Sequence, residues 1–244
     1  MEKKITKYHS GNKGFTLLEL LIVISIIAIL SVIIVIVLNP AEILRKSRDA
    51  QRISDLSTLK SALAIYATSS SSPQLDGTSG TPNDLCVGGA TPKLWVSVNT
   101  LGGGGVTITD ATPPAAWTQA AATWIQNTSA TGASLVDGTG WIPVNLGSIT
   151  GGSPISNMPV DPVNNLVVTT GSDTSAAAAV TNGALMYRYA CRKSTVSFEA
   201  DARLESLAYG VGGSDDRAAK DGGNNPLLFE MGTDLTILPS TNDF

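Results

Sequence analysis

The chain has 244 residues, of which 43% are hydrophobic and 15% are charged. This composition excludes a highly charged disordered chain, and the length allows one ordinary domain with an additional segment. Residues 1–14 carry a net charge of +3, so the total of −4 leaves −7 on residues 15–244. Phosphate binding needs a basic surface, so nucleic acid is not expected as the main partner. A small basic patch of Arg188, Arg192 and Lys193 is the alternative.

Residues 15–38 form an apolar run in which Glu19 is the only formal charge. As a helix rising about 1.5 Å per residue, the run is about 36 Å long and can cross a hydrocarbon core of about 30 Å. It exceeds the usual core of a secretory signal peptide, and no A-x-A-like cleavage site follows Leu38. The run therefore predicts a membrane helix. Basic residues lie on both sides of it and do not fix its orientation, but an acidic remainder with two cysteines favours the outside for residues 39–244.

Glu19 is the informative residue of this helix. A carboxylate in a membrane helix costs about 2.5–3.5 kcal/mol, so it needs a partner or a function, unless it reaches the interface from the first turn. The surrounding segment from Lys13 to Glu19 reads KGFTLLE. It resembles the processing site of class III signal sequences in type IV pilins and type II secretion pseudopilins.

The resemblance implies that a prepilin peptidase cuts after Gly14 and methylates the new N-terminus at Phe15. Residues 1–14 are then a cytoplasmic leader, and residues 15–38 are the membrane and polymerisation helix. Cleavage would leave an ammonium group on Phe15, which Glu19 of a neighbouring subunit could neutralise. A buried charge without its partner is strongly penalised, so this pair would fix the register of subunits.

Residues 39–68 predict an amphipathic helix that continues into the exported domain. Pro40 is expected to kink the helix without ending it. Apolar residues then recur at spacings of three and four, which predicts a stripe buried against a sheet. The stripe consists of Ile43, Leu44, Ile53, Leu56, Leu59, Leu63 and Tyr66. One long helix packed on a C-terminal antiparallel sheet is the pilin plan, so the expected fold class is α+β.

Residues 69–157 are rich in small residues and predict a loop-rich insertion that decorates the surface. It contains predicted strands at 94–98 and 106–109 and a predicted short helix at 115–126, with Trp117 and Trp124 as packing residues. The glycine run 102–105 lacks the Lys-Ser/Thr of a phosphate loop and predicts a turn.

Residues 158–244 predict an antiparallel sheet and a C-terminal loop. Pro159 to Pro162 resemble the Pro-x-Asp-Pro turn of secretion pseudopilins. Segments 166–170, 184–191 and 196–202 predict successive antiparallel strands.

Cys86 and Cys191 are the only cysteines, and they have no metal-ligand spacing. In a cytosolic protein they would be inert core thiols, whereas in an exported domain they predict a disulfide.

Secretion pseudopilins carry calcium near the C-terminus, and the tail of this chain is rich in Asp and Asn, so calcium is a possible cofactor. The spacing matches no EF-hand, and no metal ligand is assigned.

The single histidine, His9, lies in the leader, which excludes histidine-based catalysis from residues 15–244. No enzyme is expected.

The expected function is a structural subunit of a type IV pilus-like filament for adhesion, motility or DNA uptake. A type II secretion pseudopilin and a membrane-anchored exported binding domain that never polymerises are the alternatives.

The expected partners are prepilin peptidase, further copies of the chain, minor pilins, an inner-membrane assembly platform and, before assembly, the lipid bilayer. The precursor would span the cytoplasmic membrane once with its C-terminal domain outside. The mature protein would then enter an extracellular or periplasmic filament.

Overall fold

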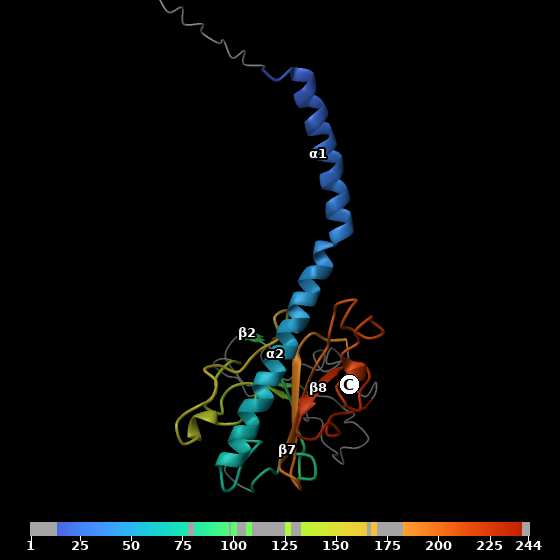
Figure 1. The fold of residues 1–244 in the computed structure, drawn as a ribbon. Coiled ribbons are helices and arrows are strands. Elements are labelled where there is room, and N and C mark those ends of the chain that lie inside the picture. Colours follow the sequence, from blue (N-terminus) through green and yellow to red (C-terminus); the bar gives the residue numbers. More distant parts are fainter. Residues whose placement is uncertain are drawn as a thin grey trace, which may run out of the picture. The chain divides into compact units, whose positions relative to one another are not determined.

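A computed structural model describes residues 14–77, 81–97, 99–101, 106–108, 125–127, 133–164, 167–169 and 183–240. The chain divides into two compact units, Met1–Ile43 and Leu44–Phe244. The architecture is α+β: two successive helices lie between residues 17 and 69, and a mainly antiparallel sheet follows (Figure 1).

Helix α1 (Leu17–Leu38) is apolar on all sides, and none of its residues is buried. Asn39 ends it in the left-handed conformation, with φ of 40°. Helix α2 (Pro40–Ser69) begins directly afterwards, and the Asn39 carbonyl accepts its first hydrogen bonds from the N–H groups of Glu42 and Ile43. Proline suits the first position of a helix because its missing N–H would have no intrahelical partner there. Pro40 therefore starts a second helix after one non-helical residue.

Helix α2 buries one stripe, as its apolar spacing predicts. Leu56, Leu59, Leu63 and Tyr66 all enter the core. The prediction was wrong at the start of the stripe, because Ile43 and Leu44 are exposed. The first fully buried residues of α2 are instead charged: Asp49 and Arg52.

The main sheet has six strands in the order β3-β4-β1-β6-β7-β8. Strands β1, β6, β7 and β8 pair in antiparallel fashion, β4 joins β1 in parallel, and β3 pairs with β4 in antiparallel fashion. Strands β2 and β5 form a separate parallel pair. The bounds are Leu94–Val96 (β1), Asn99–Leu101 (β2), Val106–Ile108 (β3), Ile125–Asn127 (β4), Val167–Thr169 (β5), Tyr187–Arg192 (β6), Ser197–Ala202 (β7) and Phe229–Gly232 (β8), with short 3-10 helices at Leu146–Ser148 and Ala218–Lys220.

The pairing differs from the sequence prediction in two places. The strand expected at 166–170 was assigned to the antiparallel series, but β5 pairs in parallel with β2. The helix expected at 115–126 was wrong at its end, because Ile125 and Gln126 lie in β4. The rest of that segment, with Trp117 and Trp124, lies outside the described residues, as does the glycine run 102–105. Strands of three residues are too short for alternation to reveal their partners.

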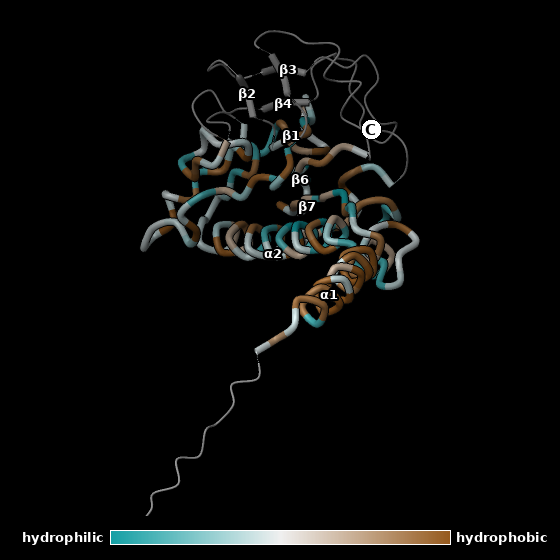
Figure 2. The backbone as a smooth tube through the Cα atoms, turned by 90° about the horizontal axis from the view of Figure 1, so that it is seen from above, coloured by the Kyte–Doolittle hydropathy of each residue, from teal (hydrophilic) through white to brown (hydrophobic). Residues whose placement is uncertain are grey.

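The core lies between α2 and one face of the sheet. Figure 2 shows α2 beside β7, β6 and β1 and contrasts its mixed hydropathy with the mostly hydrophobic α1. The predicted insertion also contributes fully buried residues, so its described part is not only surface decoration. These buried residues are Trp95, Trp141, Ile142, Val144 and Leu146. They pack with aromatic residues of the strands, such as Trp95 against Tyr189 at 5.6 Å between ring centroids.

Candidate functional site

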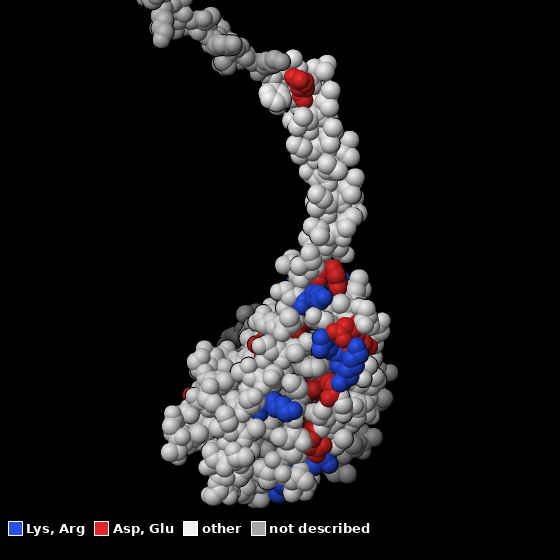
Figure 3. All heavy atoms as spheres, in the orientation of Figure 1, with Lys and Arg blue, Asp and Glu red and all other residues white. Residues whose placement is uncertain are grey.

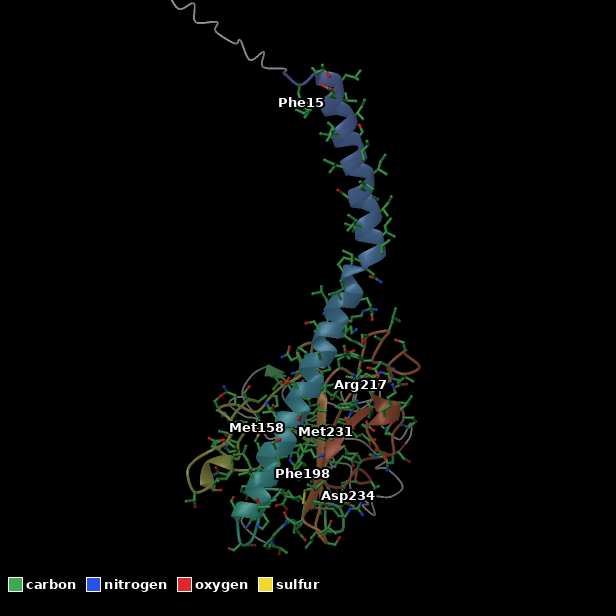
Figure 4. All side chains as sticks on the ribbon, viewed as in Figure 1. Phe15, Met158, Phe198, Arg217, Met231 and Asp234 are labelled. Atoms are coloured by element: carbon green, nitrogen blue, oxygen red, sulfur yellow. A yellow bond between two sulfur atoms is a disulfide. The ribbon has the colours of Figure 1, made fainter. Side chains whose placement is uncertain are left out.

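The bond between Gly14 and Phe15 lies in the non-helical residues that precede α1. Phe15 is 86% exposed and lies just before the first turn of α1 (Figure 4). A side chain added at Gly14 would meet no described atom within 4 Å. The predicted scissile bond is therefore uncovered by the described part of the chain. Residues 1–13 of the predicted leader, with Lys13 and His9, lie outside the described residues.

Thr16 and Glu19 close the N-terminus of α1 with reciprocal hydrogen bonds. The Glu19 N–H donates to Thr16 Oγ1 at 3.1 Å, and the Thr16 N–H donates to Glu19 Oε2 at 2.9 Å. The Thr16 hydroxyl also donates to Glu19 Oε2 at 2.9 Å. This capping box satisfies two backbone donors that a helix start leaves free. It also holds the Glu19 carboxylate at the end of the helix that faces Phe15.

The rest of α1 carries no charge. Figure 3 shows acidic atoms on this helix only at its first turn, where Glu19 lies. The hydroxyls of Ser25 and Ser31 each donate to the carbonyl four residues earlier, at 2.7 Å. Because its polar groups are satisfied internally, the helix suits an apolar solvent. By length and composition alone, one helix of the described chain could cross a membrane, the one that starts at Leu17.

Cys86 and Cys191 form a disulfide across 105 residues of sequence. Both cysteines are fully buried and belong to the core. The bond joins the loop before β1 to the strand β6, where the Val87 N–H also donates to the Cys191 carbonyl at 2.8 Å. Disulfides persist in oxidising compartments, so this bond is consistent with an exported domain.

A buried cluster of charges links α2 to the sheet, and sequence reading missed it. We call it the Arg52 cluster; its members are Arg48, Asp49, Arg52, Asp161 and Glu205. Arg52 is fully buried and donates to Asp161 through Nε at 2.7 Å and Nη2 at 3.0 Å. Its Nη1 donates to both Asp49 and Glu205 at 2.8 Å. One guanidinium therefore binds three carboxylates from three parts of the chain.

Further donors complete the Arg52 cluster. Arg48 donates to both oxygens of Glu205, at 2.7 and 2.8 Å. Asp49 accepts the backbone N–H groups of Glu205 and Ser206. Hydrogen bonds from Arg48, and then from Arg52, lower the pKa of Glu205 to about 2. Burial alone would raise it. All the carboxylates of the cluster thus have donors, as buried charges require.

Asp161 belongs to the Pro-x-Asp-Pro turn identified in the sequence. Besides binding Arg52, its Oδ1 accepts the N–H of Val163 at 2.8 Å and the N–H of Asn164 at 3.1 Å. The turn chemistry was foreseeable from Asp between prolines, but the arginine partner was not, because it lies 109 residues away. The only available signal was two charged residues, Asp49 and Arg52, in the apolar stripe of α2.

The basic patch that the sequence offered as an alternative does not form a free surface. Arg188 donates to Asp201 at 2.7 Å, Arg192 pairs with Asp234 at 3.0 Å, and Lys193 pairs with Asp84 at 2.8 Å. Each cation of the patch therefore has an acidic partner.

The acidic C-terminal loop also makes internal contacts. Asp215 pairs with Arg217 and Lys220, and Asp216 accepts the N–H of Gly212 at 2.7 Å. Among the described residues, no group of three or more His, Cys, Asp or Glu residues is arranged to hold a metal ion.

A family model for the prokaryotic N-terminal methylation motif matches residues 9–35. No curated protein and no solved structure matches the chain. The matched range contains Gly14, Phe15 and Glu19 and most of α1. The N-terminal segment is therefore a prokaryotic N-terminal methylation motif next to an apolar helix, consistent with a type IV pilin-like class III signal. Such a motif implies a membrane-anchored precursor, processing by prepilin peptidase and pilin-type assembly in general.

Proposed function

We propose that this chain is a structural subunit of a type IV pilus-like filament, with no catalytic role of its own. The main support for this proposal is the methylation motif at residues 9–35, which includes most of an exposed apolar helix. In the proposed maturation, prepilin peptidase cuts between Gly14 and Phe15 and methylates the Phe15 nitrogen. The filament would serve adhesion, motility or DNA uptake.

The surface of α1 supports assembly through this helix. All 22 residues of α1 lack burial within the chain, although nearly all are apolar. Lipid can cover them in the precursor, and copies of the same helix can cover them in a filament. Packing between unlike surfaces of identical subunits generates a filament when the rotation between subunits does not close into a ring.

Glu19 supports a specific register for that packing. Its Oε2 atom is bonded within its own chain to Thr16, while no hydrogen bond among the described residues reaches Oε1. Oε1 can therefore accept from the Phe15 ammonium of a neighbouring subunit. Removing a partner from a buried ion pair is costly, so subunits with this pair out of register would be disfavoured.

The proposed partners and location follow from this route. Before cleavage the chain would span the cytoplasmic membrane once, with residues 39–244 outside. An inner-membrane assembly platform would then move it into an extracellular or periplasmic filament with further copies and minor pilins. The buried disulfide supports the outside location of the domain.

A pseudopilin of a type II secretion system is the second candidate. It is favoured by the turn from Pro159 to Pro162, in which Asp161 is buried and tied to Arg52. A filament that stays in the periplasm and is required for protein secretion would support this candidate over a surface pilus.

The deciding experiment is mass spectrometry of the mature N-terminus together with shearing of surface filaments. We expect an N-methylated Phe15 start and sheared fibres that contain this subunit. Glu19→Ala should abolish fibres while leaving the membrane-bound protein in place. Ser25→Ala is the matched control, because the Ser25 hydroxyl bonds only to its own helix, and it should assemble normally.

Two results would contradict the proposal. An intact leader on the mature protein would exclude processing at Gly14. A processed protein that stays in the membrane and never appears in fibres would instead support a membrane-anchored binding domain.

A further inference from the structure

The face of the sheet opposite α2 buries three carboxylates. The register pairs Asp201 with Glu230 and Glu199 with Gly232. Side chains two residues apart on a strand point to the same face, so Glu199, Asp201 and Glu230 lie together. Each of the three is at most 1% exposed.

Residues 218–239, which we call the cover segment, contain strand β8. The parts of this segment before and after β8 cover this face. Glu199 Oε2 accepts the N–H of Ile237 at 2.7 Å and the N–H of Leu238 at 2.8 Å. Glu230 Oε2 accepts the N–H of Asn225 at 2.9 Å. Glu199 on β7 therefore holds the part of the cover segment that follows β8, and Glu230 on β8 holds the part that precedes it; we call these two glutamates the acid pair.

The fit around the acid pair is close. A side chain added at Gly223 would collide with the Glu230 carboxylate. The second oxygen of each glutamate, Oε1, is buried and receives no hydrogen bond from an N–H or O–H of the described residues. Glu199 and Glu230 stand on neighbouring strands, two register positions apart, with both side chains on this buried face. Two carboxylates can bond to each other only when one of them carries a proton.

The charged groups around the acid pair do not replace that proton. On β6, Arg188 is bonded to Asp201 at 2.7 Å and Arg192 to Asp234 at 3.0 Å. Asp201 on β7 adds negative charge to the same face. These neighbours favour the retention of a proton by the pair.

The cover segment contributes one more acid and a neighbouring cation. Asp221 accepts the N–H of Glu230 at 2.7 Å and so adds a further carboxyl group. Arg203, which follows β7, donates to the Leu227 carbonyl at 2.9 Å. No ion pair between a cation and either member of the acid pair is found in the described chain.

We propose that Glu199 and Glu230 share a proton, and that this proton latches the cover segment onto the sheet until alkaline pH removes it. The shared proton gives the two Oε1 atoms their missing hydrogen bond. Its loss leaves two negative charges facing each other in a buried site, and the cover segment must open to admit water.

The pKa values of the pair agree with this geometry. Burial is the main cause that raises them, to about 10 for Glu199 and about 7 for Glu230. The folded state therefore holds protons that the unfolded chain releases near pH 4.5. Stability from the pair is complete below that pH and is lost as the pH rises through about 7 to 10.

The first test is denaturant unfolding of the full chain in detergent micelles between pH 6 and pH 8. For each extra proton held by the folded state, the folding equilibrium constant should fall about tenfold per pH unit, or about a hundredfold over this range. The only histidine is in the leader, so no histidine of residues 15–244 adds to this slope.

Glu230→Gln and Glu199→Gln test the source of the slope. An amide can donate permanently to the remaining carboxylate, so either variant should flatten the pH dependence. Asp137→Asn changes an exposed acid and should keep the wild-type slope. A flat wild-type profile, or the same slope in all variants, would overturn the proposal.

A direct titration keeps the proposal testable if both variants fail to fold. With carbon-13 labels on the glutamate carboxyl groups, the signals of the acid pair should titrate above pH 6. Midpoints near 4.5 for both would refute a shared proton. Restoration of stability at pH 8 by calcium alone would also refute it, because the pair would then be a cation site.

Discussion

The Arg52 cluster and the acid pair are both buried groups of charge, yet they hold opposite protonation states. In the Arg52 cluster, guanidinium donors lower the pKa of Glu205 to about 2. In the acid pair, burial without a cation raises the pKa of Glu199 to about 10. The difference teaches that burial alone does not set the charge of a carboxyl group in this domain; the donors that surround it do.

The two regions should therefore destabilise the protein at opposite ends of the pH range. The lowered pKa of Glu205 gives stability that is present above about pH 4.5 and is lost as the pH falls toward 2. The raised pKa values of the acid pair give stability that is lost on the alkaline side. Together they predict a stability maximum on the weakly acidic side of neutrality.

Breaking the disulfide provides the reference for this comparison and has the largest expected effect. Replacing Cys86 and Cys191 by Ala frees a loop of about 100 residues, which should cost up to about 4.7 kcal/mol. The loss should be equal at every pH, because a disulfide does not titrate. Urea unfolding at pH 4, 6 and 8 measures it; a loss confined to one end of the range would contradict the separation of the two clusters.

Arg52→Met tests whether the cation defines the first cluster. The variant leaves buried carboxylates without their shared donor, so we expect a loss of about 3–5 kcal/mol at pH 7. Arg45→Ala removes an exposed arginine from the same helix and should change stability by less than about 0.5 kcal/mol.

The pH dependence of Arg52→Met sharpens the comparison further. Without the Arg52 guanidinium, Glu205 keeps its two hydrogen bonds from Arg48, so its acid-side loss of stability should become smaller without vanishing. A variant that keeps the full acid-side loss of the wild type would show that Arg52 adds nothing to the effect of Arg48 on Glu205.

Glu205→Gln should have the smallest effect of the three. Glu205 loses charged hydrogen bonds to Arg48 and Arg52, which should cost about 2 kcal/mol at pH 7. The same change should make the fall in stability between pH 5 and pH 2.5 shallower, by up to about 3 kcal/mol. Thermal unfolding across this range checks both effects, and an unchanged acid profile would assign the acid loss to other carboxylates.

The N-terminal features could be read from the sequence because they are local. The motif around Gly14, Phe15 and Glu19 lies within a few residues, and the apolar run of α1 is continuous. The stripe of α2 at Leu56, Leu59 and Leu63 follows from helical periodicity. Each of these signals depends on neighbours in the chain, and therefore needs no knowledge of the fold.

The antiparallel pairing of the strands expected at 184–191 and 196–202 was confirmed, but the pairing of the short strands and the buried charges could not be read in this way. Strand β8 was not predicted, and β5 and β2 pair across more than sixty residues. The wrong helix at 115–126 likewise came from local spacing alone, where Ile125 and Gln126 pair with β1 and β3 instead.

The sequence by itself determined how the N-terminus is marked for processing, where an apolar helix lies and which cysteines can pair. Only the tertiary structure decided that Arg52 binds Asp161 and that Glu199 and Glu230 are buried on one face of the sheet. The physical reason is that a helix or a cleavage motif depends on neighbouring residues, whereas the charge of a buried carboxyl group depends on which donors the fold brings to it.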